Sequence, residues 1–138
     1  MHEFRLRVYY EDVDLAGIVY YANYLRFIER GRTEALIAAG VDQARLKAET
    51  GIVFAVRRVE VDYLHPARFQ DELTVTTALA GMGGARVELM QEVRRDGAAL
   101  VRARVVIVAL DAAGRPARMP GEMRAAMAGL GRRAAEGG

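Results

Sequence analysis

The 138-residue sequence contains no cysteine and only two histidines, His2 and His65. The absence of cysteine excludes disulfide bonds, thiolate nucleophiles and cysteine-ligated metal sites. Two histidines are too few for a histidine-rich zinc site. We therefore expect neither a bound metal nor a redox cofactor.

Long apolar runs and blocks of one charge are also missing. No apolar run approaches the roughly 20 residues of a membrane span, and the first five residues lack the apolar core of a signal peptide. The arginines are spread along the chain and the formal net charge is +2, which argues against a dedicated nucleic-acid-binding face. We expect a cytoplasmic protein with no transmembrane segment and no nucleic-acid partner.

The length of the chain suits one domain. Hydrophobic residues make up 52% of the sequence, which is enough for one substantial core. After Asp111 the composition turns to Ala, Gly and Arg, with a short helix near 122–130. We expect a single domain at residues 1–130, followed by a disordered tail at residues 131–138.

Hydrophobic periodicity predicts one long helix and five strands. Helical spacing covers residues 22–39, with Asn23 as the N-cap and Gly40 as the stop signal. Gly31 lies inside this helix, and close approach of a neighbouring backbone would explain it. Residues 42–51 are expected to form a connector with at most one helical turn. The segments with a two-residue period are 4–10, 53–64, 72–80, 85–95 and 99–110.

The order of these elements predicts an α+β fold, in which one antiparallel sheet covers one apolar helix. Such a helix would be cradled in a curved sheet. The edges of an open sheet need protection. Pairing two sheets edge to edge is one solution, so we expect a homodimer or a homotetramer.

The densest group of polar and aromatic residues is the segment 9–24. It places carboxylates in a loop directly before the start of the long helix, where N–H groups are unpaired and the helix dipole is positive. Such N–H groups can stabilise an oxyanion, and a nearby carboxylate can attack a carbonyl or activate water. Acidic residues in this position also cap helices, so spacing alone leaves both interpretations open.

The run YEDVDLAGIVYYANY at residues 10–24 resembles the signature of the 4-hydroxybenzoyl-CoA thioesterase family, and is closest to its branch of Tol-Pal-associated acyl-CoA thioesterases. The segments FIERGRTE at 27–34 and VDYLHPAR at 61–68 match the same branch. The resemblance covers residues 4–110. It implies the hotdog fold, in which a curved five-stranded antiparallel sheet wraps around one long central helix.

The resemblance also implies the catalytic residues. The second acidic residue of the Asp-x-Asp element, Asp14, is expected to be the catalytic carboxylate, acting as nucleophile or as general base. The backbone N–H of Tyr21 is expected to contact the oxyanion. The Tol-Pal-associated branch often has histidine at this position, whereas tyrosine is typical of the 4-hydroxybenzoyl-CoA branch. A main-chain contact would survive that substitution.

Four further residues are expected to contact the substrate. Gly17 would shape the loop and allow the thioester to come close. Asn23 would cap the helix and orient the loop, and Tyr24 would line an acyl pocket or pack in the core. His65 lies in the 61–68 segment, which in this family approaches the partner's site. Asp12 is expected to order the loop.

The predicted reaction is hydrolysis of an acyl-CoA to a free acid and CoA, with CoA as part of the substrate and no other cofactor. One alternative is a hotdog hydratase or dehydratase acting on acyl-CoA or acyl carrier protein. Such sites usually pair an acid with a histidine, and the Asp14 loop contains none. The other alternative is a non-catalytic binding module associated with the cell envelope.

Overall fold

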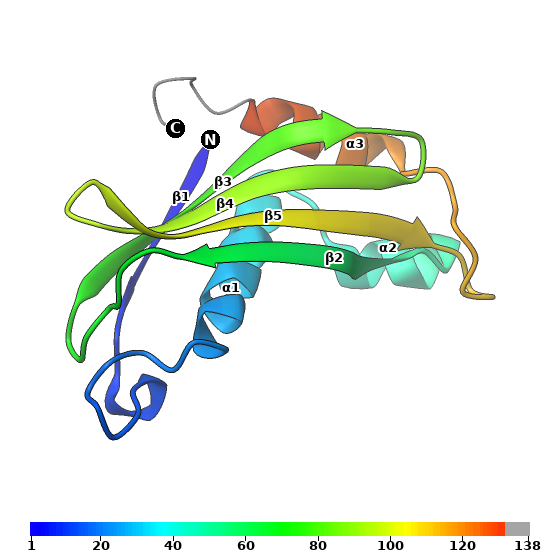
Figure 1. The fold of residues 1–138 in the computed structure, drawn as a ribbon. Helices are drawn as coiled ribbons and strands as arrows, with labels where there is room; N and C mark the ends of the chain where they lie inside the picture. The colour runs from blue at the N-terminus through cyan, green and yellow to red at the C-terminus, as the bar shows by residue number, and fades with distance from the viewer. Residues whose placement is uncertain (132–138) are drawn as a thin grey trace.

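Five strands and three α-helices form the computed structural model, which describes residues 1–131 (Figure 1). The predicted tail lies outside the described residues except for Gly131. The strands are β1 His2–Arg7, β2 Val53–Tyr63, β3 Glu72–Met82, β4 Arg86–Arg95 and β5 Ala98–Leu110. The helices are α1 Asn23–Ala38, α2 Gln43–Thr50 and α3 Gly121–Leu130, and a short 3-10 helix, η1, spans Tyr10–Asp12.

The strands form one sheet in the order β1-β3-β4-β5-β2, and every neighbouring pair is antiparallel. The long helix α1 contacts β1, β3 and β4 on one face of the sheet (Figure 1). This arrangement is the predicted α+β hotdog fold. The almost wholly apolar strand β5 lies inside the sheet, as its composition predicts, while β1 and β2 form the two edges.

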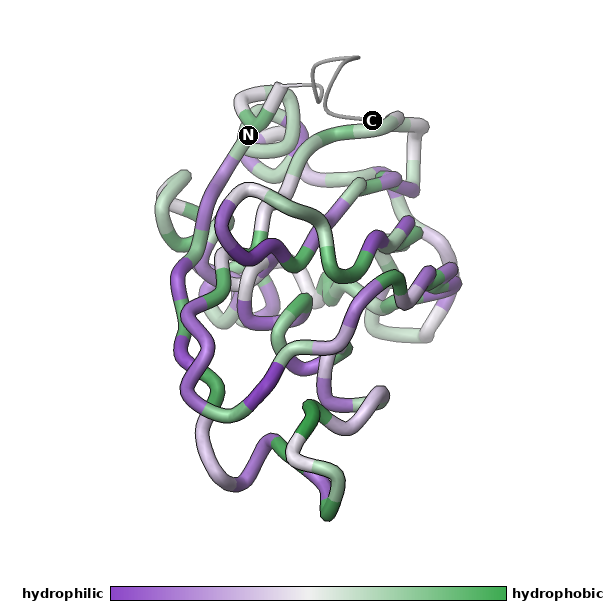
Figure 2. Tube along the Cα trace, turned by 60° about the vertical axis from the view of Figure 1, so that its left-hand side comes forward, coloured by the Kyte–Doolittle hydropathy of each residue, from purple (hydrophilic) through white to green (hydrophobic). Residues whose placement is uncertain are grey.

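Alternation along the strands builds the core against α1. Hydrophilic and hydrophobic residues alternate along the strands in Figure 2. On β4, Val87, Leu89 and Val93 are buried, and Phe27 and Ile28 of α1 are almost fully buried as well. The same two-residue period predicts the strands from sequence, because only one face of each strand meets the helix.

Gly31 sits where α1 crosses β3. A β-carbon at Gly31 would lie 2.5 Å from Cγ1 of Val75, far inside van der Waals contact. Close packing does explain this glycine, but the neighbour is a valine side chain of the strand and not the backbone that we expected.

Several boundaries shift by one or two residues, and the largest differences are at β1, expected at 4–10, and at the 42–51 connector. Strand β1 ends at Arg7 because the N–H of Tyr9 donates to Oδ2 of Asp12 at 2.8 Å and turns the chain into η1. The expected connector at 42–51 contains a true helix, α2. Oδ1 of Asp42 accepts from the N–H of Arg45 at 3.0 Å, which caps the helix start. Gly51 ends it with φ at 74°, where glycine is favoured.

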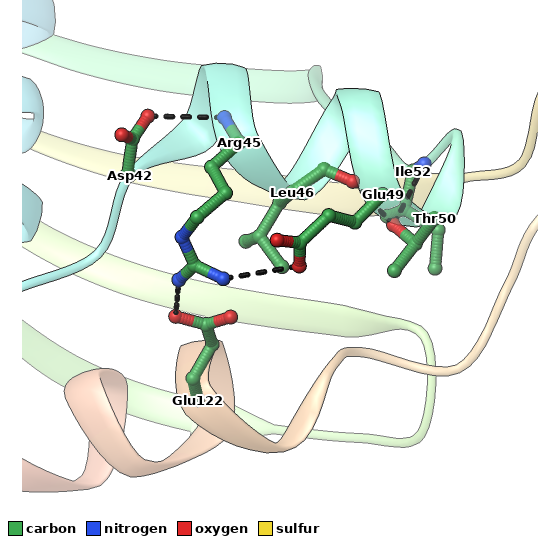
Figure 3. A network of polar contacts seen from close by, with 7 residues as sticks. All are labelled: Asp42, Arg45, Leu46, Glu49, Thr50, Ile52 and Glu122. Carbon is green, nitrogen blue, oxygen red and sulfur yellow. Dashed lines mark hydrogen bonds and ion pairs between the residues drawn. The ribbon is translucent and has the colours of Figure 1, made fainter.

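Helix α3 is tied to α2 by the side chain of Arg45 (Figure 3). Its Nη2 lies 2.7 Å from Oε2 of Glu122, and its Nη1 lies 3.1 Å from Oε2 of Glu49. The carboxylate of Glu122 is the main reason that the pKa of Arg45 is raised. Buried Met123 and Met127 on the inner side of α3 join a hydrophobic cluster with Leu36 of α1.

Candidate active site

Residues 12–20 form a narrow loop that folds back on itself before α1. The N–H of Asp14 donates to the carbonyl of Ile18 at 3.0 Å, and the N–H of Tyr20 donates to the carbonyl of Asp12 at 3.1 Å. The loop lies at the lower end of the molecule in Figure 1, opposite the end where α3 packs. It therefore projects from the first turn of α1.

Asp14 is exposed in this loop, and its carboxylate is oriented by the chain around it. Its Oδ1 accepts from the N–H of Ala16 at 2.8 Å, while its carbonyl accepts from the N–H of Gly17 at 3.0 Å. Gly17 has φ at 77°, a conformation that favours glycine, so its predicted role in shaping the loop is confirmed. Within residues 1–131, Oδ2 of Asp14 has no hydrogen-bond partner, which leaves that oxygen available for chemistry.

Asp12 serves the loop structurally. Its carboxylate is buried, with a residue exposure of 6%. One oxygen accepts from the N–H of Tyr9, and the other accepts from Nδ2 of Asn23 at 2.8 Å. Asp12 thus fastens the loop to the first residue of α1, as its predicted ordering role requires.

The predicted helix cap at Asn23 is wrong. The N-cap is Ala22, which already has helical angles of −69° and −21° and provides no side-chain acceptor. The amide of Asn23 points toward Asp12 as a donor, which agrees with the second expectation, that Asn23 orients the loop. The first turn of α1 is therefore left without a side-chain cap.

The N–H of Tyr21 lies in the turn that begins α1. Among the residues that the structure describes, this N–H has no hydrogen-bond partner. Unpaired N–H groups at a helix start carry partial positive charge and favour an anionic ligand. The side chain of Tyr21 is 61% exposed and points out to an aromatic cluster.

That aromatic cluster covers the start of α1. The ring of Tyr21 lies 4.9 Å from that of Tyr20 and 6.0 Å from that of Tyr63. A hydrogen bond with the side chain of Tyr21 is the main cause of the raised pKa of Tyr20. Tyr63 was not among the site residues predicted from the sequence. Its place in the 61–68 segment, which matches the family, could have indicated that it lies near the site.

Tyr24 and His65 occupy different environments beside the loop. Tyr24 is 3% exposed, and its hydroxyl accepts from the N–H of Ala67 at 2.9 Å. Burial is the main cause of its raised pKa. The carbonyl of Ala67 in turn accepts from the N–H of Val19 at 2.9 Å, which joins this segment to the Asp14 loop. His65 is exposed on the same segment.

A cavity of about 250 Å³ lies at the other half of α1, between α1, β2 and α3. None of the predicted site residues lines it. Arg32 stands in its wall, and partial burial lowers the pKa of this arginine. Its Nη1 donates to Oε1 of buried Gln91 at 3.2 Å. This cavity was not predicted from the sequence, although Met119, Met123 and Met127 recur at the four-residue spacing of one helix face.

Neither a metal centre nor a membrane span is found in the described part of the chain. No three His, Asp or Glu side chains within residues 1–131 are placed to hold a metal ion. None of the helices in the same range is both long and apolar enough to cross a membrane.

Comparison with protein families gives one clear match. The model of the thioesterase-like superfamily matches residues 8–127. Among curated proteins, the acyl-CoA thioesterase YbgC of Haemophilus influenzae is 37% identical over 124 residues, which cover 89% of this chain and 91% of that protein. The acyl-CoA thioester hydrolase YbgC of Escherichia coli is 40% identical over 107 residues, which cover 77% of this chain and 79% of that protein.

Solved structures share the architecture. A probable thioesterase from Bartonella henselae has a TM-score of 0.82 and 36% sequence identity, and the match covers 86% of this chain and 98% of that one. The match therefore covers most of the fold of both chains.

Proposed function

Because the chain belongs to the thioesterase-like superfamily and is a thioester hydrolase, we propose that it hydrolyses acyl-CoA to a carboxylic acid and free CoA. The family predicted from the motif at residues 10–24 is confirmed by these matches. The observation that carries the proposal is the exposed, oriented carboxylate of Asp14 in the loop that leads into the uncapped start of α1.

Asp14 and the N–H of Tyr21 divide the chemistry between them in this proposal. The N–H polarises the thioester carbonyl and stabilises the oxyanion that forms on it. Asp14 has two routes. Its free Oδ2 attacks the carbonyl carbon and expels CoA thiolate, and water then cleaves the resulting anhydride. Alternatively, the carboxylate takes a proton from water, whose oxygen attacks the same carbon. Both routes need an ionised carboxylate and no metal.

The proposed substrate-binding residues lie in the Asp14 loop or in segments joined to it by hydrogen bonds. Gly17 presents no side chain beside the carboxylate, so a thioester has room to approach. Asn23 holds the loop through Asp12. Tyr24 positions the 64–68 segment through Ala67, and His65 on that segment faces solvent, where it is available to CoA or to a second subunit.

We propose that a second copy completes the site by pairing along β2. This edge strand spans 11 residues, whereas the other edge, β1, spans 6. Antiparallel pairing about Val59 would set Arg58 opposite Glu60 of the partner subunit, and Glu60 opposite the partner's Arg58. The two exposed charges are thus complementary in this register. Association of two such dimers into a homotetramer would use surfaces other than the β2 edge.

The test is thiol release from a panel of acyl-CoAs, read with a thiol-reactive dye, together with identification of the free acid. Hydrolysis releases one thiol for each acid formed. A hydratase or dehydratase would change the acyl group and leave the thioester intact. Release of thiol and acid in equal amounts supports the proposal, and an unchanged thioester across the panel contradicts it.

A further inference from the structure

The cavity beside α3 has a polar mouth and an apolar closed end. Glu29 is exposed at the rim, and Val56 on the edge strand β2 is 46% exposed. At the opposite side Met119, Met123 and Met127 are buried. This gradient of exposure gives the cavity a direction, from the free edge of β2 inward to α3.

The lining of the closed end fits a flexible hydrocarbon chain. Methionine is unbranched and adapts to irregular apolar shapes, and three of the six methionines of the chain lie here. The cavity volume of about 250 Å³ is below the roughly 300 Å³ at which pockets for drug-sized ligands begin, so the cavity holds only part of a substrate. The methionines offer only weak acceptors, so a hydroxyl group on an aromatic acyl ring would lose its hydrogen bonds at this depth.

The cavity and the Asp14 loop of the same protomer lie at opposite ends of β2. Val56 marks the mouth of the cavity, and Tyr63 belongs to the aromatic cluster at the start of α1. Seven residues of extended strand separate them, which is about 23 Å. Antiparallel pairing of two β2 strands removes this separation, because it sets Tyr63 of one copy beside the N-terminal end of β2 in the other.

We infer that this cavity receives the distal part of an aliphatic acyl chain whose thioester lies at the partner's Asp14, and that Met123 and Met127 of α3 set the chain length. The inference rests on the proposed function and its dimer, and it names the acyl class of that site. Helix α3 is well placed to act as the end wall, since Arg45 and Glu122 hold it against α2 (Figure 3).

The experiment compares kcat/KM for acetyl-, butanoyl-, octanoyl-, dodecanoyl- and benzoyl-CoA. The wild type is compared with Met123→Trp, which fills the closed end, and with Met123→Ala, which deepens it. Ala128→Trp is the matched control, because Ala128 is exposed on the outer side of the same helix. Circular dichroism and melting temperature establish that each variant is folded.

For the wild type, kcat/KM is expected to rise by about fourfold per accommodated methylene group and to favour aliphatic over benzoyl substrates. Met123→Trp should lower kcat/KM at least tenfold for octanoyl- and dodecanoyl-CoA and leave acetyl-CoA within twofold. Met123→Ala should move the preference toward longer chains, and the control should match the wild type.

Two results would overturn the inference while leaving the proposed function standing. One is active enzyme whose chain-length profile is the same in all four proteins. The other is a wild type that prefers benzoyl-CoA. Binding supplies a readout without turnover: in an Asp14→Asn background, Met123→Trp should weaken the affinity for dodecanoyl-CoA and not for acetyl-CoA. Absence of thiol release from every acyl-CoA would instead defeat the proposed function, and this inference with it.

Discussion

Two aspartates, two residues apart, have opposite environments in the loop before α1. Asp12 is buried and accepts from the N–H of Tyr9 and the amide of Asn23. Asp14 is exposed and keeps one oxygen free within the described residues. The fold therefore uses the first carboxylate to hold the loop and leaves the second exposed, as the proposed chemistry requires.

Substitution by asparagine separates the two roles. In Asp12→Asn, the new amide NH₂ group faces either the N–H of Tyr9 or the amide of Asn23, both of which are donors. One buried donor then loses its acceptor, which costs about 1–3 kcal/mol. We expect Asp12→Asn to lower the free energy of unfolding by that amount, and Asp14→Asn to change it by no more than about 0.5 kcal/mol. Urea denaturation monitored by circular dichroism measures both. A greater loss of stability in Asp14→Asn than in Asp12→Asn would contradict the assignment.

The residue types of the site could be predicted from sequence, but their partners could not. The resemblance of the motif at 10–24 implies Asp14 and the N–H of Tyr21 as the reacting groups, and both assignments stay predictions. Asn23 looks like a cap because asparagine commonly accepts from the first helical turn. Its actual use as a donor depends on Asp12 being folded back beside it, which is a tertiary contact that spacing does not reveal.

Among the helices and strands, those with a strong period were predicted well and α2 was not. Helix α1 buries residues at helical spacing, and β4 buries Val87, Leu89 and Gln91 in alternation, so their periodicity marks them. The edge strand β2 contains no buried residue, but its residue types still alternate. Helix α2 buries only Leu46, so periodicity does not reveal it. Its caps, Asp42 and Gly51, were the signals that remained in the sequence.

The packing of α1 on β3 depends on Gly31. In Gly31→Ala, the new β-carbon would clash with Val75, which is fully buried and stiff at its branched carbon. Overpacking costs about 1–3 kcal/mol, whereas alanine gains about 1 kcal/mol over glycine in a helix. We expect net destabilisation, measured as a lower urea midpoint. Adding Val75→Ala to Gly31→Ala should recover part of the lost stability. If the single and the double variant lose the same stability, the proposed clash is refuted.

For the whole molecule, the sequence suggested an edge-to-edge dimer, and the fold shows which edge has the length for it. The structure contains one protomer, so the register of pairing stays a prediction. It follows from the charges on β2, where Arg58 and Glu60 stand on the exposed face one residue either side of Val59.

Charge reversal tests that register. Arg58→Glu would face Glu60 of the partner subunit with like charge at two symmetric places, and Glu60→Arg would do the same with positive charge. Cross-strand charge pairs are each worth roughly 0.2–1 kcal/mol, and two pairs are lost, so each single variant should dimerise up to roughly thirtyfold more weakly. A mixture of the two should form heterodimers preferentially, as analytical ultracentrifugation and native mass spectrometry would show. Statistical mixing would exclude the register.

The same charge pair allows the shared site to be tested by complementation. Asp14→Asn is placed on the Arg58→Glu chain, and Met123→Trp on the Glu60→Arg chain. Each homodimer should keep at most about a tenth of the wild-type rate on dodecanoyl-CoA. In the heterodimer, one of the two sites combines an intact Asp14 with an intact cavity of the other subunit, so we expect roughly half the wild-type rate. An inactive heterodimer would mean that each subunit uses its own cavity.

The central claim is that Asp14 performs the hydrolysis, and the most direct measurement is kcat for thiol release by Asp14→Asn beside the wild type at equal concentrations of folded dimer. The account predicts a loss of roughly a hundredfold or more, because the amide can neither attack the thioester nor take a proton from water. The melting temperature should stay unchanged. Turnover within twofold of the wild type in the folded variant would contradict the account.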